Sequence, residues 1–381
     1  MGTMERILRL MAERDASDIY LSANSPVLIR IDGDCRPVNA QVLPAEAPLA
    51  LLAEVVDAGH IAELQRSGEL NMAIRLDGAG NFRISAMRQR GSYAVVVRHI
   101  AAVIPPFDTL GLPEVLKTLV MEKRGLILMV GGTGAGKTTT LASMLDHRNA
   151  NASGHILTIE EPIEFTFTNR KSVVNQRDVG SDTASLDVAL KNALRQAPDV
   201  IHIGEIRDCD TMSAAIAYAQ SGHLCVATLH ASNSHRALNR ILGFYPAEVR
   251  GALLSDLSGA LRAIVAQRLL RTQDRGRLPA IEILLNTALV AELLEKGDFA
   301  AIKDAMEQSM AEGSQTFEES IARLVVDGRV TRDEGLAQAD SPTNLLWRLQ
   351  NRNAKVITEE RSVFAPIEAP TFTDITLDVH F

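Results

Sequence analysis

The chain has 381 residues, more than one hydrophobic core usually organises, so we expect two compact domains. Its formal net charge of −8 argues against a protein that works mainly by neutralising nucleic-acid phosphates. The three cysteines stand far apart without a CxxC pair, and no apolar stretch approaches the roughly 18 residues of a membrane span, so we expect reduced thiols in a cytosolic protein.

The first hundred residues show the period-two alternation of half-buried strands. Large apolar residues recur at every second position at 27, 29 and 31 and again at 72, 74 and 76, and an Asp-Gly turn signal follows each run. Residues 49–56 instead carry apolar side chains at helical spacing. We therefore predict a small α+β domain with an antiparallel sheet over residues 1–103. In its later strands Phe82 and Ile84 share one face, so Arg83 must point to the other.

A change of pattern follows two consecutive prolines. Pro105 and Pro106 favour an extended connector, which we assign to residues 104–110. Short apolar runs then alternate with helical patterns, and these runs lie at 126–130, 156–159, 200–203 and 224–227. Such runs are typical of central strands covered on both faces, and the alternation predicts a parallel α/β sheet.

The C-terminal third is predicted to be helical. Helical spacing runs from 288 to 337, with expected breaks at Gly297, Gly313 and Gly328, so a small helical bundle closes the α/β domain. We place this domain at 111–350. Beyond it apolar residues become sparse and prolines appear, so residues 351–381 are predicted to form a flexible tail.

Residues 131–138 read GGTGAGKT and match the P-loop pattern GxxxxGK[ST] between an apolar strand and a helical pattern. Glycines let backbone N–H groups curl around phosphates, Lys137 reaches the outer phosphates, and the Thr138 hydroxyl can coordinate Mg²⁺. The alternative is a glycine-rich turn that binds nothing. We assign ATP binding to Gly131, Gly132, Thr133, Gly134, Ala135, Gly136, Lys137, Thr138 and Thr139.

Three further segments carry acids and histidines at the ends of predicted strands. The strand at 200–203 contains His202 and ends in Gly204 and Glu205, and Glu205 is placed to hold the water shell of Mg²⁺. Strand ends of a parallel sheet meet at one edge, where a carboxylate can position water and a histidine can sense phosphate. The alternatives without a catalytic role are an exposed glutamate at a helix start and hydrogen-bonded structural histidines. The other candidate side chains are Glu160, Glu161, Glu164, His223 and His230.

In this order, the four segments resemble the secretion-type ATPases of the type II and type IV pilus superfamily, with their Walker A, Asp-box, Walker B and His-box motifs. Residues 172–177, 204–208 and 267–270 (SVVNQR, GEIRD and QRLL) resemble the retraction branch, PilT and PilU. The resemblance implies a hexameric ring in which a PAS-like N-terminal domain precedes a RecA-like motor domain, with nucleotide between them.

The resemblance also implies roles for individual residues. It makes Glu164 the general base and Glu205 the Walker B acid, and it makes Arg83 and Arg98 the N-terminal arginines that reach toward the γ-phosphate. Read as bare sequence, both arginines are ordinary solvent-facing strand residues. The full set of catalytic candidates is Lys137, Glu160, Glu164, Glu205, Arg207, His223 and His230.

Departures from the family pattern favour the PilU type. The acidic box reads Glu160-Glu161 where Glu-Asp is usual, which keeps the charge. Residues 285–294 stand in the place of the AIRNLIRE signature of PilT but lack its arginine and asparagine at their places. Residues 372–379 resemble the longer tail of PilU, and the four-cysteine zinc motif of extension ATPases is absent from the sequence.

The expected function is therefore an ATP- and Mg²⁺-dependent homo-hexameric motor that drives or assists pilus retraction as a PilU-like accessory ATPase. Its expected partners are a PilT-like ATPase and the inner-membrane platform protein, at the cytoplasmic face of that membrane, without direct insertion. The alternative is a nucleotide-binding docking ring that strengthens a PilT motor with little hydrolysis of its own. A RecA-like nucleic-acid motor is disfavoured by the charge balance, so we expect no nucleic-acid partner.

Overall fold

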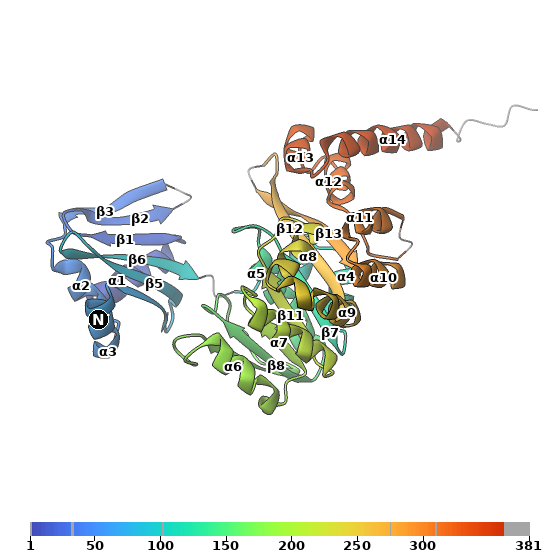
Figure 1. Ribbon diagram of the computed structural model, residues 1–381. Helices are drawn as coiled ribbons and strands as arrows, with labels where there is room; N and C mark the ends of the chain where they lie inside the picture. The colour runs from blue at the N-terminus through green and yellow to red at the C-terminus, as the bar shows by residue number, and fades with distance from the viewer. Residues whose placement is uncertain (1, 32–33, 101–102, 275, 309–310, 362–381) are drawn as a thin grey trace, which may run out of the picture. The chain divides into compact units, whose positions relative to one another are not determined.

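The computed structural model describes residues 2–31, 34–100, 103–274, 276–308 and 311–361 (Figure 1). The chain divides into two compact units. The first comprises residues 1–269 and 277–316, and the second comprises residues 270–276 and 317–381. Both sheets lie largely in the first unit, together with every predicted site residue.

The N-terminal sheet is antiparallel and has six strands in the order β3-β2-β1-β6-β5-β4. The strands are β1 (Asp18–Ser22), β2 (Pro26–Ile31), β3 (Asp34–Val42), β4 (Glu69–Leu76), β5 (Gly80–Gln89) and β6 (Ser92–Ile100). The helices that share its core are α1 (Thr3–Glu13), α2 (Ala47–Leu52) and α3 (Ala58–Ser67). This arrangement agrees with the α+β pattern expected from the period-two alternation.

Alternation along β5 separates the core from the solvent. Phe82 and Ile84 are completely buried in the same core as the α1 residues Met4 and Leu8. Arg83 points to the other face and is exposed, as predicted. It pairs across the β5–β6 ladder with Arg98, which is also exposed. The two arginines therefore stand side by side on the face of the sheet that does not enter the core.

The second sheet has seven strands in the order β13-β12-β7-β11-β10-β8-β9, and its ladders from β12 to β9 are parallel. The strands are β7 (Gly125–Val130), β8 (Gly154–Glu160), β9 (Ser172–Asp178), β10 (Val200–Ile203), β11 (Leu224–Leu229), β12 (Leu261–Arg271) and β13 (Arg277–Leu285). The accompanying helices are η1 (Phe107–Thr109), α4 (Val115–Val120), α5 (Lys137–Asn151), α6 (Leu186–Ala193), η2 (Leu194–Gln196), α7 (Cys209–Gln220), α8 (Ser234–Gly243), η3 (Ala247–Val249) and α9 (Arg250–Ala260).

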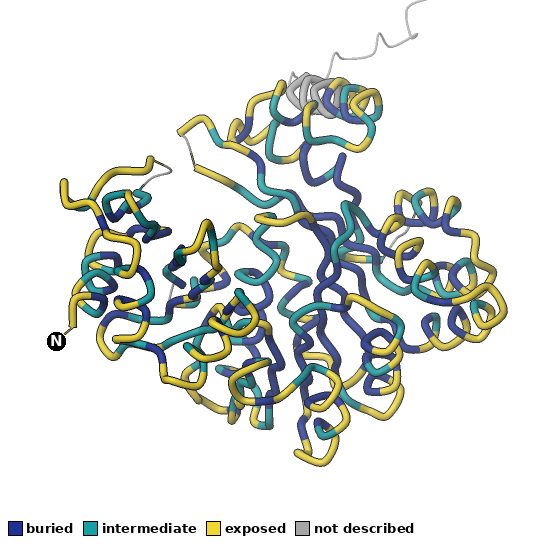
Figure 2. The backbone as a smooth tube through the Cα atoms, turned by 60° about the vertical axis from the view of Figure 1, so that its left-hand side comes forward, coloured by how far each residue is buried: buried dark blue, intermediate teal, exposed yellow. Residues whose placement is uncertain are grey.

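Burial confirms the prediction of a sheet covered on both faces. Every residue of β7, β10 and β11 is buried, and the central strands are dark blue in Figure 2. Helices α4 and α5 pack on the strands through Leu116, Leu141 and Met144. The apolar runs identified β7, β8, β10 and β11, whereas β9, β12 and β13 were not predicted as strands, because their apolar residues are interleaved with polar ones.

Helices follow the second sheet, as the spacing from 288 to 337 predicts. Those of the first unit are α10 (Ala288–Lys296) and α11 (Phe299–Gln308). Those of the second unit are α12 (Phe317–Val326), α13 (Arg332–Gln338) and α14 (Pro342–Arg361). All three predicted glycine breaks fall between helices, and Gly297 ends α10 in the left-handed conformation with φ 71°.

Two boundaries need comment. Helix α14 continues to Arg361, so it extends into the segment predicted as a flexible tail, and residues 362–381 lie outside the described residues. The domain boundary at 103 and 104 stays a prediction. Among the described residues, no helix combines the length and the apolar character needed to cross a membrane.

We expect Phe82→Ala to destabilise the N-terminal sheet by about 3–5 kcal/mol, because it leaves a cavity in a fully buried site where the ring also stacks on His99. Val42→Ala is the matched control, since Val42 is 55% exposed on β3 and should change the stability by less than about 0.5 kcal/mol. Denaturant unfolding followed by circular dichroism measures both, and equal midpoints for the two variants would contradict the assignment of the core.

Candidate active site

The glycine-rich loop connects β7, the buried central strand, to α5. Gly136 caps the helix in the left-handed conformation with φ 84°, and a Cβ atom there would lie 2.8 Å from the Nε2 atom of Gln267. A Cβ atom on Gly131 would lie 2.7 Å from the carbonyl oxygen of Gln267. Both positions therefore require glycine, and at both the obstacle is a residue of β12.

Gln267, on β12, holds the glycine-rich loop in place through its side chain. Its Nε2 donates to the carbonyl oxygen of Ala135 at 2.8 Å, and its Oε1 accepts from the hydroxyl of Thr140 at 2.8 Å. The side chain is buried, so both bonds form away from solvent. In the sequence Gln267 is only part of a motif that marks the retraction branch, and this role could not be predicted, because the contacts join residues more than a hundred positions apart.

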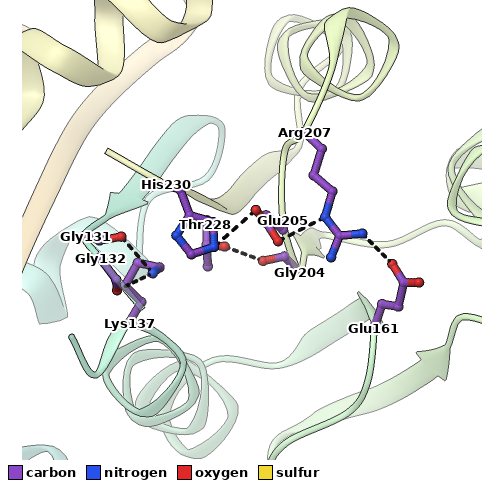
Figure 3. Close-up of polar contacts among 9 residues, drawn as sticks. All are labelled: Gly131, Gly132, Lys137, Glu161, Gly204, Glu205, Arg207, Thr228 and His230. Atoms are coloured by element: carbon purple, nitrogen blue, oxygen red, sulfur yellow. Dashed lines mark hydrogen bonds and ion pairs between the residues drawn. The ribbon is translucent and has the colours of Figure 1, made fainter. Parts of the chain in front are cut away.

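Lys137 begins α5 and reaches back over the loop (Figure 3). Its Nζ donates to the carbonyl oxygens of Gly131 at 2.9 Å and Gly132 at 3.0 Å. Burial lowers the pKa of Lys137, while the nearby carboxylates of Glu205 and Glu164 oppose that shift. The ammonium group is therefore partly desolvated, and the two hydrogen bonds given above go to backbone carbonyl groups of the loop, an arrangement that suits a phosphate ligand.

Glu205 follows β10 and is the centre of a chain of charged groups (Figure 3). Its Oε2 accepts from Nε of Arg207 at 3.0 Å, and its Oε1 lies 3.3 Å from Nε2 of His230. Arg207 also donates from Nη1 to Glu161 at 3.0 Å. Hydrogen bonding to Glu205 raises the pKa of Arg207 above its usual value. The hydroxyl of Thr228 donates to the carbonyl oxygen of Gly204 and joins the ends of β10 and β11.

Glu160 ends β8 and is chemically different from its neighbour Glu161. Glu160 is buried, and its Oε1 accepts from the hydroxyl of Thr158 at 2.7 Å. Burial raises the pKa of Glu160 to about 7. Glu161 and Glu164 are exposed. The acidic box therefore holds one buried carboxyl group with a raised pKa and two carboxyl groups that are exposed to solvent.

A cavity of about 340 Å³ joins these segments within the first unit. It includes the predicted residues of the P-loop, the acidic box, the Walker B strand and the N-terminal sheet. The predicted site residues that line it are Arg83, Arg98, Thr133, Gly134, Lys137, Thr138, Glu160, Glu161, Glu164, Glu205, Arg207 and His230.

Three further predicted residues line adjoining cavities. Thr139 lines one of about 230 Å³ together with Arg83, Arg98 and Glu164. Gly131 and Gly132 line another with His230.

His223 does not join this group. It precedes β11, whereas His230 follows it, and the six-residue strand separates the two histidines by about 20 Å. His223 lies at the amino end of the strand, where its Nδ1 is 3.0 Å from the hydroxyl of Ser221. The structure therefore corrects the grouping of both histidines at the phosphate edge, because one strand cannot present both of its ends to the same cavity.

His202 is a cavity residue to which the sequence analysis gave no role. It is buried in β10 and lines the main cavity, and within the described part of the chain neither ring nitrogen has a hydrogen-bond partner. Burial lowers its pKa to about 4, so the ring is neutral at pH 7. The available signal was its interruption of an otherwise apolar strand.

A glycine-rich loop between the buried parallel strand β7 and a helix, with an acid at the end of β10, the next strand but one in the sheet, defines a P-loop nucleotide hydrolase of the α/β class. The chain belongs to the Type II/IV secretion system protein family, whose model matches residues 2–335. It is an ATPase of the pilus retraction branch of that family.

Comparison with known proteins supports this placement. The chain is 45% identical over 342 residues to the type IV pilus ATPase PilU of Pseudomonas aeruginosa, and the aligned region covers 90% of each chain. It is 35% identical to PilT of the same organism, over 89% of this chain and 98% of that protein. A crystal structure of the pilus retraction motor PilT with bound ADP superposes with a TM-score of 0.83 at 36% identity, covering 90% of this chain and 98% of that one. The predicted fold class and ATPase activity are confirmed.

We expect Glu160→Gln to stabilise the protein relative to the wild type, and to do so more at pH 8 than at pH 5. Below about pH 4.5 this carboxyl group is protonated in both the folded and the unfolded chain, so its burial costs little. Between about pH 4.5 and pH 7 this group ionises in the unfolded chain but stays largely protonated in the folded one. The wild type therefore loses up to about 3 kcal/mol of folding free energy, and the variant does not.

Unfolding midpoints of the wild type and Glu160→Gln at the two pH values measure this difference. Glu248→Gln, at an exposed position, controls for the loss of one charge. If the stability difference between Glu160→Gln and the wild type is the same at pH 5 and pH 8, the burial argument is wrong.

Proposed function

We propose that the chain is a PilU-like accessory motor of type IV pilus retraction, which works as a homo-hexameric ring. The observation that carries the proposal is the cavity in which the P-loop, Glu164, Glu205 and His230 meet the paired arginines of the N-terminal sheet. Groups from both sheets line the place proposed for the phosphates, so a change in phosphate charge acts on both. This coupling is what a mechanochemical ATPase requires.

In this proposal each residue has a separate task in hydrolysis. The loop N–H groups and Lys137 hold the phosphates, and Glu164 orients the attacking water and accepts its proton. Arg83 and Arg98 approach the γ-phosphate, where they stabilise the charge that develops on its oxygens. His230 reports on the phosphate through its contact with Glu205.

The residues present also fit Mg²⁺. This ion prefers octahedral oxygen ligands and usually takes one or two from the protein, with the rest from water and phosphate. The hydroxyl of Thr138 and the carboxylate of Glu205 both line the cavity and provide such oxygens. When bound there, the ion neutralises charge on the phosphates.

The partners in this proposal are those that the family resemblance implies. A PilT-like ATPase and the inner-membrane platform protein are the expected contacts, at the cytoplasmic face of the membrane. The proposal includes no nucleic-acid partner, which is consistent with the net charge of −8.

A second candidate function is a docking ring that holds nucleotide and strengthens a PilT motor with little hydrolysis of its own. The segment at 285–294 favours it, because this segment differs from the signature of PilT. The test of this alternative is whether the isolated chain turns over ATP.

We expect Lys137→Ala and Glu164→Ala to lower steady-state ATP hydrolysis by about 100-fold or more, since the first removes the phosphate-binding ammonium and the second the proposed base. Lys171→Ala, at an exposed position away from the cavity, should retain wild-type activity. Phosphate release is measured with and without a PilT-type ATPase. A wild type no more active than the two cavity variants in either condition would overturn hydrolysis by this chain.

We expect deletion of residues 362–381 to abolish co-purification with the PilT-type ATPase of the same cell while ATP hydrolysis by the isolated chain continues. The deletion keeps α14 complete, so it removes only the segment that contains the PilU-like residues 372–379. Co-purification is measured by affinity capture at equal protein concentration. Unchanged capture would exclude this segment as the contact.

A further inference from the structure

Glu164, the proposed base, lies on a connection that belongs to no helix or strand. It is placed between the end of β8 at Glu160 and the start of β9 at Ser172. A base must be held to within a fraction of an ångström of its productive position, because small displacements cost large factors in rate. The regular elements do not supply that constraint, so other contacts must hold this loop.

Gln176 on β9 clamps the loop on the C-terminal side of Glu164. Its Nε2 donates to the carbonyl oxygen of Phe165 at 2.7 Å, and its Oε1 accepts from the N–H group of Phe167 at 2.9 Å. One side-chain amide thus satisfies two backbone groups, as a neighbouring strand would. The ring of Phe165 is buried, which fixes the same residue from its other side.

Asp178 holds the loop on the N-terminal side. Its Oδ2 accepts from the N–H group of Ile163 at 3.0 Å, and the carboxylate is buried. Hydrogen bonds therefore hold the backbone at Ile163 and Phe165, directly before and after Glu164, whose side chain lines the cavity.

The register of the sheet explains why these residues act together. Asp178 pairs with Glu160, and Gln176 pairs with Thr158, on the parallel ladder between β9 and β8. Residues two apart on a strand share a face, so Gln176 and Asp178 point to the side where Glu160 lies. Asn175, one position away, is exposed.

We propose that Gln176 and Asp178 are positioning residues for Glu164, and that they set the rate of hydrolysis through the loop backbone without touching nucleotide. The inference rests on the proposed function, in which Glu164 is the base. It assigns a task to Gln176, which in the sequence was only part of the segment 172–177 that marks the retraction branch, and to Asp178, which directly follows that segment.

The first test separates turnover from binding. We expect Gln176→Ala and Asp178→Ala to lower kcat by roughly 10- to 100-fold, with the KM for ATP within about twofold of wild type, since the P-loop is untouched. Asp178→Asn keeps an oxygen that can accept the Ile163 N–H bond, so it should restore most of the activity. Asn175→Ala, at the exposed neighbour on the same strand, should behave as wild type.

The second test is a double-mutant cycle. If Gln176 acts only through Glu164, Gln176→Ala causes no further loss in the Glu164→Ala background. An equal loss in both backgrounds, or a Gln176→Ala variant with wild-type kcat, would overturn the positioning role alone. Wild-type activity of Glu164→Ala would overturn the proposed base, and the inference with it.

A third measurement is independent of hydrolysis. Hydrogen exchange of the backbone amides at 163–167 should become faster in Gln176→Ala and stay unchanged in Asn175→Ala, because only the first loses the bond to Phe167. Unchanged exchange in a folded Gln176→Ala variant contradicts the proposal, even where the residual activity of the double variant is too small to measure.

Discussion

Parallel pairing of four buried strands decides where the reactive groups of this ATPase lie. Ile203 pairs with Ile159 on one side and with Ala227 on the other, and Leu229 pairs with Val130. The strands therefore end at one edge of the sheet, which brings the P-loop, the acidic box, Glu205 and His230 together. A slip of one residue would turn each buried side chain to the opposite face, so packing on both faces holds the register and, with it, the site.

Three of the glutamates at this edge have different surroundings and so different chemistry. Glu160 is buried and its pKa is raised to about 7, Glu164 is exposed at the cavity, and Glu205 already contacts both Arg207 and His230. A metal ion at Glu205 must compete with Arg207 for that carboxylate. Arg207 also contacts Glu161 at 3.0 Å and is half exposed, so it keeps an ion pair when Glu205 turns away. Ion pairs at exposed side chains contribute little stability, so replacing Arg207 by a metal ion at Glu205 costs little free energy.

The sequence predicted the parts of the site that are local in the chain. The P-loop pattern, the apolar runs of the central strands and the outward direction of Arg83 all depend on residues close together, and the structure agrees with them. The hydrogen bonds of Gln267 to the P-loop and α5, and those of Gln176 to the loop around Glu164, join distant segments. No periodicity or motif in one sequence could therefore assign a role to these two residues. His223 shows the opposite error, since nearness in the sequence suggested nearness in space although a whole strand intervenes.

The segment that differs from PilT shows where specialisation within the family is to be sought. Asn286 donates from Nδ2 to the carbonyl oxygens of Ser258 and Leu261, and Thr287 caps α10 through the N–H group of Val290. These polar residues hold the segment in place, and none of them lines the cavity. Leu289 on the same helix is 50% exposed, so the segment presents an apolar side chain to the solvent. Because the groups assigned to hydrolysis line the cavity and this segment does not, a difference in role from PilT would arise from what such surfaces contact.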